Sequence, residues 1–130
     1  MIREFIIADL DRFEPNDYSR PDDVRYVFED EGWWNYTLEN SCVKAIVCFK
    51  ENALGEWAVF ALLSKYFRAR DSVEMRDFML RAQDVLKPKK LWTISKPIEK
   101  TSRWHRFFGF VFERPQEFQG ETYNLWARVG

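Results

Sequence analysis

Hydrophobic and polar residues alternate along much of this chain in a pattern that predicts β-strands. The strand-like runs lie at Met1–Ala8, Trp33–Phe49, Glu56–Ser64, Lys90–Ser95, Phe110–Glu113 and Glu121–Val129. The longest run contains the turn-forming residues Glu39, Asn40 and Ser41, so we predict that it folds as a hairpin.

Apolar residues at three- and four-residue spacing predict helices between these runs. The clearest helix covers Asp71–Leu86, where Met75, Phe78, Met79 and Ala82 share one face and Pro88 follows the last turn. A second amphipathic helix is predicted at Pro97–Phe108, and the segment Ser19–Gly32 has helix signals as well. The order strand, helix, three strands, helix, strand, helix, two strands indicates one α+β domain over residues 1–130.

Composition narrows the class of protein. With 130 residues, 46% of them hydrophobic and 32% charged, the chain is large enough for one core and polar enough for a soluble protein. No apolar run approaches the roughly 18 residues that span a bilayer, so we expect a cytoplasmic protein without membrane contact. Cys42 and Cys48 lie about 20 Å apart on one predicted strand and are too far apart for a disulfide. With His105 as the only histidine, we expect no metal site.

Charge is distributed unevenly along the chain. Residues 9–31 hold nine acidic residues against three arginines, whereas residues 87–106 hold seven basic residues against one glutamate. The basic segment is a candidate for binding a phosphate backbone, with Trp104 offering a stacking surface. The pI of about 5.9 lacks the basic bias of nucleic-acid-binding domains, so we expect no nucleic-acid partner.

Several short motifs, taken with the element order, resemble the GNAT-type N-acetyltransferase superfamily. They are the opening strand and Asp-Leu turn of Ile2–Phe13, Arg68 after the predicted central strand, and the pair Gly109-Phe110 after the last helix. The resemblance implies a GNAT-like fold, with a central, mixed but mostly antiparallel sheet of about six to seven strands and about three to four helices.

The cofactor loop of that family differs in this chain. In the family, an Arg/Gln-x-x-Gly-x-Gly loop lets backbone N–H groups approach the pyrophosphate of acetyl-CoA at a helix N-terminus. Counted from Arg68, the two glycine positions hold Asp71 and Val73, and counted from Arg70 they hold Val73 and Met75. Neither register contains a glycine, so the loop is degenerate.

The residues after Arg70 also carry negative charge at the predicted helix start. Asp71 and Glu74 have the spacing of a capping box, which would use N–H donors that a pyrophosphate needs. We therefore expect no cofactor. If acetyl-CoA does bind, the resemblance implies that it contacts Arg68, Arg70, Ser72 and Val73.

Two residues are candidates for catalysis if the protein is an enzyme. The resemblance places His105 where the family commonly has a tyrosine that protonates the leaving thiolate, and histidine can act as an acid near neutral pH. The alternative for His105 is a helix histidine that packs between Trp104 and Phe108 or faces solvent. By the same analogy Glu56 is a candidate general base, and its alternative is an exposed charge at the start of a strand.

A GNAT-like domain with a degenerate loop also resembles the small internal virion proteins of short-tailed phages. The resemblance rests mainly on "LWTIS" at Leu91–Ser95, on the helix that contains Thr101 and Ser102, and on "GFVFE" at Gly109–Glu113. It implies a non-catalytic virion, assembly or ejection component that acts through contacts with virion or host proteins. The alternative is a divergent acetyl-CoA-dependent N-acetyltransferase, and a nucleic-acid-binding module comes third.

Trp33 and Trp34 are neighbours and face opposite ways if they lie on a strand. We expect one of them in the core and the other at an edge or on a partner surface. The sequence leaves open which of the two is exposed, the identity of any partner or acetyl acceptor, and the oligomeric state.

Overall fold

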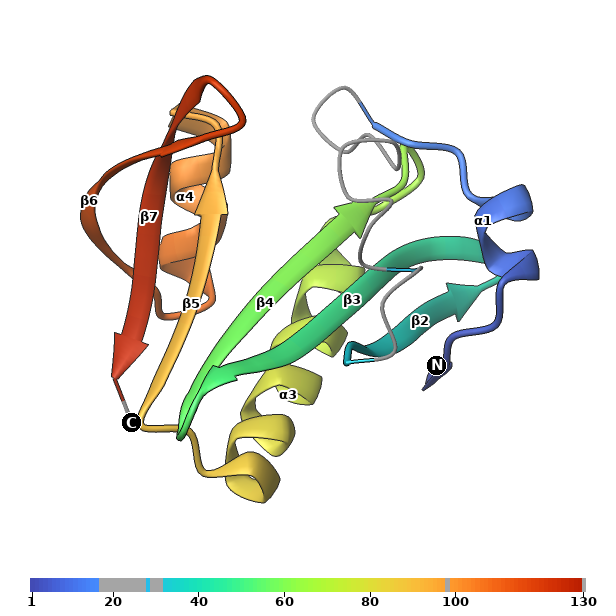
Figure 1. Ribbon diagram of the computed structural model, residues 1–130. Helices are drawn as coiled ribbons and strands as arrows, with labels where there is room; N and C mark the ends of the chain where they lie inside the picture. Colours follow the sequence, from blue (N-terminus) through green and yellow to red (C-terminus); the bar gives the residue numbers. More distant parts are fainter. Residues whose placement is uncertain (17–27, 29–31, 98, 130) are drawn as a thin grey trace.

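Seven strands form one sheet in the order β1-β2-β3-β4-β5-β7-β6 in a computed structural model, which describes residues 1–16, 28, 32–97 and 99–129 (Figure 1). The strands in chain order are β1 Ile2–Glu4, β2 Trp34–Asn40, β3 Cys42–Ala53, β4 Glu56–Leu63, β5 Lys90–Ser95, β6 Val111–Phe118 and β7 Glu121–Val129. The described residues also form the helices α1 Ala8–Arg12, α3 Ala69–Leu86 and α4 Glu99–Phe107. This α+β architecture is the one that the element order predicts.

Most predicted elements are confirmed, and the differences lie at element ends. β5 and β7 have the predicted bounds, and the hairpin of β2 and β3 turns at Ser41 with a positive φ of 68°. The predicted first strand is wrong beyond Glu4, because the chain turns into the short helix α1. The helix predicted at Ser19–Gly32 lies almost entirely outside the described residues.

The strands β4 and β5 pair for only a short distance. They are the one parallel pair in the described sheet, and their register consists of Glu56↔Lys90, Trp57↔Leu91 and Ala58↔Trp92. Beyond Ala58 the two strands diverge, as Figure 1 shows for the upper halves of β4 and β5. The space between β4 beyond Ala58 and β5 beyond Trp92 is called the β4–β5 opening below.

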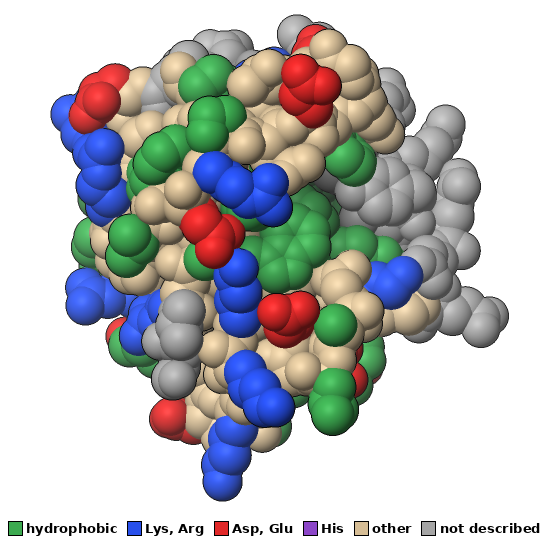
Figure 2. All heavy atoms as spheres, turned by 60° about the vertical axis from the view of Figure 1, so that its left-hand side comes forward, with side chains coloured by type: hydrophobic (Ala, Val, Ile, Leu, Met, Phe, Trp, Pro, Cys, Tyr) green, Lys and Arg blue, Asp and Glu red, His purple; other side chains and the backbone are tan. Residues whose placement is uncertain are grey.

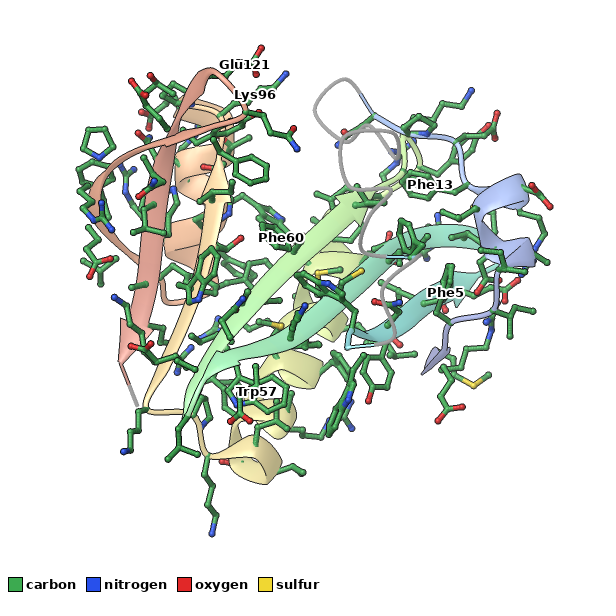
Figure 3. All side chains as sticks on the ribbon, viewed as in Figure 1. Phe5, Phe13, Trp57, Phe60, Lys96 and Glu121 are labelled. Carbon is green, nitrogen blue, oxygen red and sulfur yellow. The ribbon has the colours of Figure 1, made fainter. Side chains whose placement is uncertain are left out.

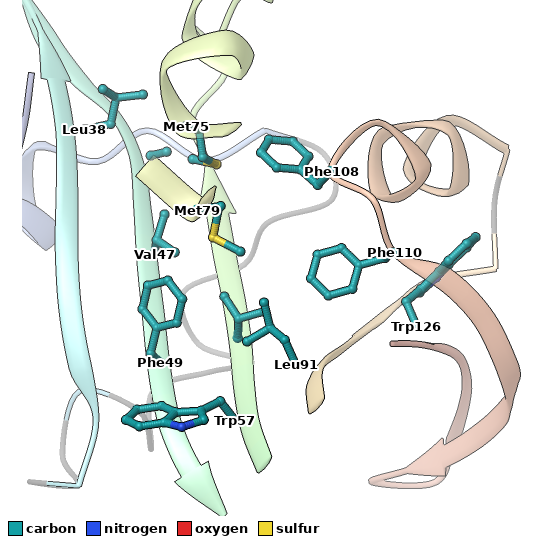
Figure 4. Close-up of a cluster of buried hydrophobic side chains, with 12 residues drawn as sticks. Leu38, Val47, Phe49, Trp57, Met75, Met79, Leu91, Phe108, Phe110 and Trp126 are labelled. Carbon is teal, nitrogen blue, oxygen red and sulfur yellow. The ribbon is translucent and has the colours of Figure 1, made fainter. Parts of the chain in front are cut away.

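A cluster of apolar side chains joins the two halves of the sheet behind this opening. α3 lies behind β3 and β4, and α4 lies behind β5 and β7 (Figure 1). The predicted core face of α3 is confirmed, since Met75 and Met79 are buried and Phe78 and Ala82 pack against the same cluster. Figure 4 shows Phe108 and Phe110 reaching toward α3 from the β5–β7 half. The side chains therefore connect strands that the backbone leaves apart.

A second apolar cluster covers the other face of the sheet. Its buried members are Phe13, Trp33, Val43, Ile46, Cys48, Ala58 and Leu62. Trp33 is 9% exposed, whereas Trp34 is 52% exposed and lies edge-on to Trp57 at 5.5 Å. The alternation predicted for the two tryptophans is confirmed, and Trp33 is the core residue. None of the described helices is both long enough and apolar enough to cross a membrane.

The buried carboxylate of Asp9 fixes α1 to the sheet edge. Asp9 is 0% exposed, and its Oδ1 atom lies 2.8 Å from guanidinium nitrogens of both Arg3 and Arg12. Its Oδ2 atom accepts a hydrogen bond from the Thr37 hydroxyl on β2 at 2.8 Å. Glu39 bridges the same two arginines at 2.7 Å each. Every oxygen of the buried carboxylate thus has partners, as a buried charge requires.

Replacing Met75 by Ala should destabilise the protein by about 2–5 kcal/mol, because it removes a core side chain and leaves a cavity. Urea unfolding measures this loss as a lower midpoint. Val73, which is 54% exposed on the same helix, provides the control Val73→Ala, which should change the midpoint little. Equal midpoints for the Met75 and Val73 variants would contradict the packing described here.

Replacing Asp9 by Asn should cost about 3 kcal/mol, because it leaves two arginines without their buried partner. Burial alone raises the pKa of Asp9, but hydrogen bonds from Arg3, Ile6, Thr37 and Arg12 hold that pKa well below its usual range. The Asp9 contribution is therefore complete above the unfolded pKa of about 3.9 and is lost as the pH falls from there through the folded pKa.

Urea midpoints of the wild type and Asp9→Asn, measured at pH 7 and pH 3, check this expectation. The difference between the two proteins should shrink at pH 3. The exposed neighbour Asp11 provides the control Asp11→Asn, for which we expect little change at either pH. A difference for Asp9→Asn that is the same at both pH values would count against the ion-pair explanation.

Candidate functional site

The edge of β4 that faces β5 offers, in the β4–β5 opening, a peptide group without a strand partner in the described part of the chain. The Ser64 N–H bonds to Lys44 in β3, whereas the Leu63 C=O accepts from the Asn16 N–H at 3.1 Å on the other side of the strand. Because backbone groups alternate along a strand, Ala61 points the same way as Leu63, toward β5. The β4–β5 ladder ends at Ala58, so the N–H and C=O of Ala61 have no strand partner among the described residues.

The segment of residues 14–16 covers the C-terminal end of this edge of β4. Pro15 and Ser64 form an isolated antiparallel bridge, and the Lys65 N–H donates to the Glu14 C=O at 2.9 Å. The ion pair of Lys65 with Glu14, at 3.2 Å, supports the same contact. The open part of the β4 edge is therefore centred on Ala61.

Aromatic rings line the front of the β4–β5 opening. Phe60 on β4 and Trp92 on β5 meet edge-to-face with ring centroids 6.1 Å apart, and Phe60 also contacts Trp33 at 5.5 Å. Figure 3 shows Phe60 where β4 and β5 diverge, with Phe5 and Phe13 toward the end of the sheet at which α1 lies. These half-buried rings form an apolar wall across the opening.

The molecular surface combines an apolar hollow with charges of both signs. Figure 2 brings the β5–β7 side forward and shows hydrophobic side chains in a hollow, with Lys or Arg and Asp or Glu side chains around it. The described residues form no continuous basic surface on this face. A phosphate backbone would need such a surface, so the mixed rim argues against nucleic-acid binding here, and that expectation stays a prediction.

The loop between β4 and α3 ends in a helix cap that differs from the predicted one. The N-cap residue is Arg68, and its N–H donates to the Asp71 Oδ2 atom at 2.8 Å. The prediction of a capping box from Asp71 to Glu74 is wrong, because Asp71 lies in the third helical position rather than at the cap. Glu74 instead accepts from the Asn40 side chain at 3.2 Å and pairs with the N-terminal ammonium at 3.0 Å.

Asp71 nevertheless brings a buried carboxylate to the N-terminus of α3. It is 0% exposed, and its Oδ1 atom accepts from the Asn40 amide at 3.3 Å. A carboxylate in the first turn compensates the partial positive charge of the helix end. One backbone donor, the Arg68 N–H, is thus occupied from inside the protein, whereas the N–H groups of Ala69 and Arg70 have no partner in the described part of the chain.

The four residues predicted to contact a cofactor gather at this helix start. Arg68 and Arg70 are exposed, Ser72 is half-buried, and Val73 is 54% exposed. The Arg68 guanidinium donates to the C=O groups of Lys65 and Phe67 at 3.1 and 3.2 Å, which folds its side chain back on the loop. The structure therefore brings these residues together, and their role in binding stays a prediction.

The candidate acid His105 is buried in the interface between α4 and β7. It is 7% exposed, stacks on Trp126 at 5.5 Å, and also contacts Trp104 and Phe110. Burial lowers the pKa of His105, and the Thr101 C=O, 2.7 Å from Nδ1, only partly opposes that shift. Since a carbonyl only accepts, Nδ1 carries the hydrogen of a neutral ring. These contacts fit the alternative of a packed helix histidine. Phe110 and Trp126, rather than the expected Phe108, lie against the ring together with Trp104.

Glu56 lies at the closed end of the β4–β5 pair. It is the first residue of β4, it is exposed, and its register partner is Lys90. The strands diverge at the opposite end of β4. The structure thus does not bring Glu56 and His105 together, and Glu56 occupies the exposed strand-start position that we gave as its alternative.

Trp104, at the back of the β4–β5 opening, has a hydrogen-bond donor that the sequence did not point to. The Trp104 Nε1–H is buried and has no hydrogen-bond partner among the described residues, while the Trp104 ring packs on Phe108 at 4.5 Å. Figure 4 shows Phe108 beside Met75, at the back of the β4–β5 opening. Buried polar groups normally have a partner, so this donor suits a ligand oxygen. Only the fold could reveal it, because no local pattern distinguishes this tryptophan.

Comparison with known proteins identifies the fold of this chain through solved structures and finds no match to its sequence among family profiles or curated proteins. Among solved structures, a ribosomal-protein alanine N-acetyltransferase from Escherichia coli has a TM-score of 0.72 and 13% identity, covering 99% of this chain and 92% of its own.

Two further structures agree with it. A spermidine N-acetyltransferase mutant from Vibrio cholerae has a TM-score of 0.70 and 11% identity, covering 99% of this chain and 94% of its own. A protein provisionally named a phosphinothricin N-acetyltransferase has a TM-score of 0.74 and 17% identity, covering 99% and 97%. The chain therefore has the GNAT-type N-acetyltransferase fold, as the sequence resemblance implies. None of these three is a phage protein, so the resemblance to virion proteins stays a prediction.

Replacing Asp71 by Ala should destabilise the protein by about 1–2 kcal/mol, because the Arg68 N–H and the helix end lose their carboxylate. Urea unfolding at pH 7 measures this loss. Asp77, which is exposed in the middle of the same helix, provides the matched control Asp77→Ala, and its midpoint should hardly move. A stability loss for Asp77→Ala as large as that for Asp71→Ala would contradict a specific capping role.

Proposed function

We propose that this protein binds acetyl-CoA along the β4–β5 opening and transfers the acetyl group to an amine, the activity given above as the alternative. The observation that carries the proposal is the Ala61 peptide at the β4 edge, which has no strand partner among the described residues, at the point where parallel pairing stops in an N-acetyltransferase fold. A strand edge of this kind binds an extended chain that contains amides. The pantetheine arm of coenzyme A is such a chain.

The residues around the opening fit the thioester end of the cofactor. Acetyl-CoA supplies an activated acetyl group whose thioester carbon accepts an amine and releases the thiol. Ala61 would hold the arm through its N–H and C=O, and the Trp104 indole would donate to a carbonyl oxygen that reaches the back of the opening. Phe60 and Trp92 would exclude water from the same space.

The part of the proposed site that would hold the phosphates of acetyl-CoA has hydrogen-bond donors that differ from those of the glycine loop in the resembling family. With Asp71 bonded to the Arg68 N–H, the remaining groups are the N–H groups of Ala69 and Arg70 and the two exposed guanidinium groups. Arginine binds phosphate through paired donors, so Arg68 and Arg70 would replace the backbone donors of a glycine loop. The buried charge of Asp71 would make this binding weaker than in a glycine loop.

The environment of His105 favours a base over an acid. Because Nδ1–H donates to the Thr101 C=O, the neutral ring has its lone pair on Nε2, which takes a proton and has none to give. His105 would therefore act on the ammonium of an incoming amine rather than on the leaving thiolate. This role is part of the proposal, as is a role for Glu56, which would need a substrate that reaches the closed end of the strands.

A non-catalytic protein that acts through protein contacts is the second candidate function. The buried Asp71 carboxylate at the glycine position and the buried His105 favour it, because each occupies a place that the reaction needs. Such a protein keeps the fold as a scaffold and binds no cofactor. A role as a virion or assembly component of a phage would be the specific form of this candidate.

Acetyl-CoA should stabilise the folded protein. At a hundred times its Kd, a ligand that binds only the folded state adds about 2.7 kcal/mol, which for a domain of this size raises the melting temperature by several degrees. The variant Arg68→Ala/Arg70→Ala should lose most of this shift. Arg81, exposed at the other end of α3, provides the control Arg81→Ala, which should keep the full shift.

The same samples separate the two candidates. If acetyl-CoA at millimolar concentration gives no shift with the wild type, the acetyltransferase proposal fails and the non-catalytic candidate stands. If the shift appears, release of free thiol is followed with a panel of primary amines. A shift that survives unchanged in Arg68→Ala/Arg70→Ala would place the phosphates elsewhere on the protein.

A further inference from the structure

A groove lies on the face of the sheet that α3 covers, between that helix and strands β1–β3. It has a volume of about 560 Å³, and its walls include Trp34, Tyr36, Phe49, Phe78, Arg81 and Val85. These residues define the α3 groove. The proposed acetyl-CoA site uses the first turn of α3 and the β4–β5 opening, whereas the α3 groove is lined by α3 residues between Glu74 and Leu86 and shares none of the residues of that site.

The walls of the α3 groove are aromatic and already in contact with one another. Tyr36 and Phe78 have ring centroids 5.2 Å apart, and Phe49 lies 6.2 Å from Tyr36 and 6.1 Å from Phe78. Trp34, 52% exposed, adds a fourth ring at the rim. A volume of a few hundred cubic ångströms with apolar walls and few polar groups is typical of a small-molecule site.

The charged groups at the rim favour an anionic head group. Glu74 also lines the groove, but its carboxylate is engaged by the N-terminal ammonium at 3.0 Å and by the Asn40 amide at 3.2 Å. Arg81 is exposed and pairs with no carboxylate in the described ranges. The uncompensated charge at the rim is therefore positive.

We propose that the α3 groove binds an amphipathic carboxylate, with its apolar body against the aromatic walls and its carboxylate on Arg81. Burial of the apolar body against the aromatic walls supplies the driving force. The guanidinium supplies the preference for an anion, because Arg forms paired, charge-assisted hydrogen bonds with a carboxylate. This site is independent of the proposed acetyl-CoA site.

Titration calorimetry with decanoate tests the site, with decyltrimethylammonium as a probe of equal chain length and opposite charge. We expect decanoate to bind and the cation to bind at least tenfold more weakly. Arg81→Gln should weaken decanoate roughly tenfold, as the loss of one charge-assisted contact implies. Arg76→Gln is the matched control, because Arg76 lies over the Phe107 ring on the opposite flank of α3, and it should leave the affinity unchanged.

A second pair of exposed positions tests the apolar wall without disturbing the fold. Val85 is 80% exposed and lines the groove, whereas Val73 is 54% exposed and lies outside it. Val85→Asp should lower decanoate affinity at least tenfold, and Val73→Asp should not change it. The proposal is overturned if millimolar decanoate does not bind, if the cation binds equally well, or if the two valine variants behave alike. Loss of acetyl-CoA binding in Arg68→Ala/Arg70→Ala would have no bearing on these results.

Discussion

The rest of this structure depends on the point where β4 and β5 stop pairing. In the described sheet the ladder between β4 and β5 consists of three residue pairs, from Glu56↔Lys90 to Ala58↔Trp92. Above them, the apolar cluster that includes Met75, Met79, Phe108 and Phe110 takes over the connection. Side-chain packing tolerates an unpaired strand edge because it does not use the backbone groups. The fold can therefore keep the Ala61 peptide available without losing cohesion between its halves.

Two fully buried aspartates fix the segments around that core in different ways. Asp9 holds α1 to the sheet edge through Arg3, Arg12 and Thr37, and its charge is matched by two cations. Asp71 holds the β4–α3 loop through the Arg68 N–H and the Asn40 amide, and its charge is matched by the helix end. The second arrangement bears on the proposed cofactor site, because the carboxylate occupies the same positive helix end that would attract a phosphate.

These constraints shape the proposed chemistry. The thioester end of a cofactor would meet preformed groups, namely the Ala61 peptide and the buried Trp104 N–H. The phosphate end would rely on the exposed guanidinium groups of Arg68 and Arg70, and Arg68 would have to leave its bonds to the Lys65 and Phe67 C=O groups. Such a site binds with less affinity than a rigid glycine loop, because ordering long side chains costs conformational entropy. The α3 groove has the opposite character, since its rings are already packed together.

The sequence by itself determined the elements and the fold class. The apolar and aromatic residues of β5 and β7 and the four-residue spacing of Met75 and Met79 are local signals, and the element order carried the resemblance to the acetyltransferase fold. Only the tertiary structure decided the cap of α3, since Asp71 and Glu74 fit one box by spacing while Asn40, from a distant strand, engages both carboxylates. It also decided the surroundings of His105, the burial of the Trp104 N–H away from any described acceptor, and the aromatic walls of the α3 groove. Each of these joins residues far apart in the chain, and local pattern holds no information on which distant side chains meet.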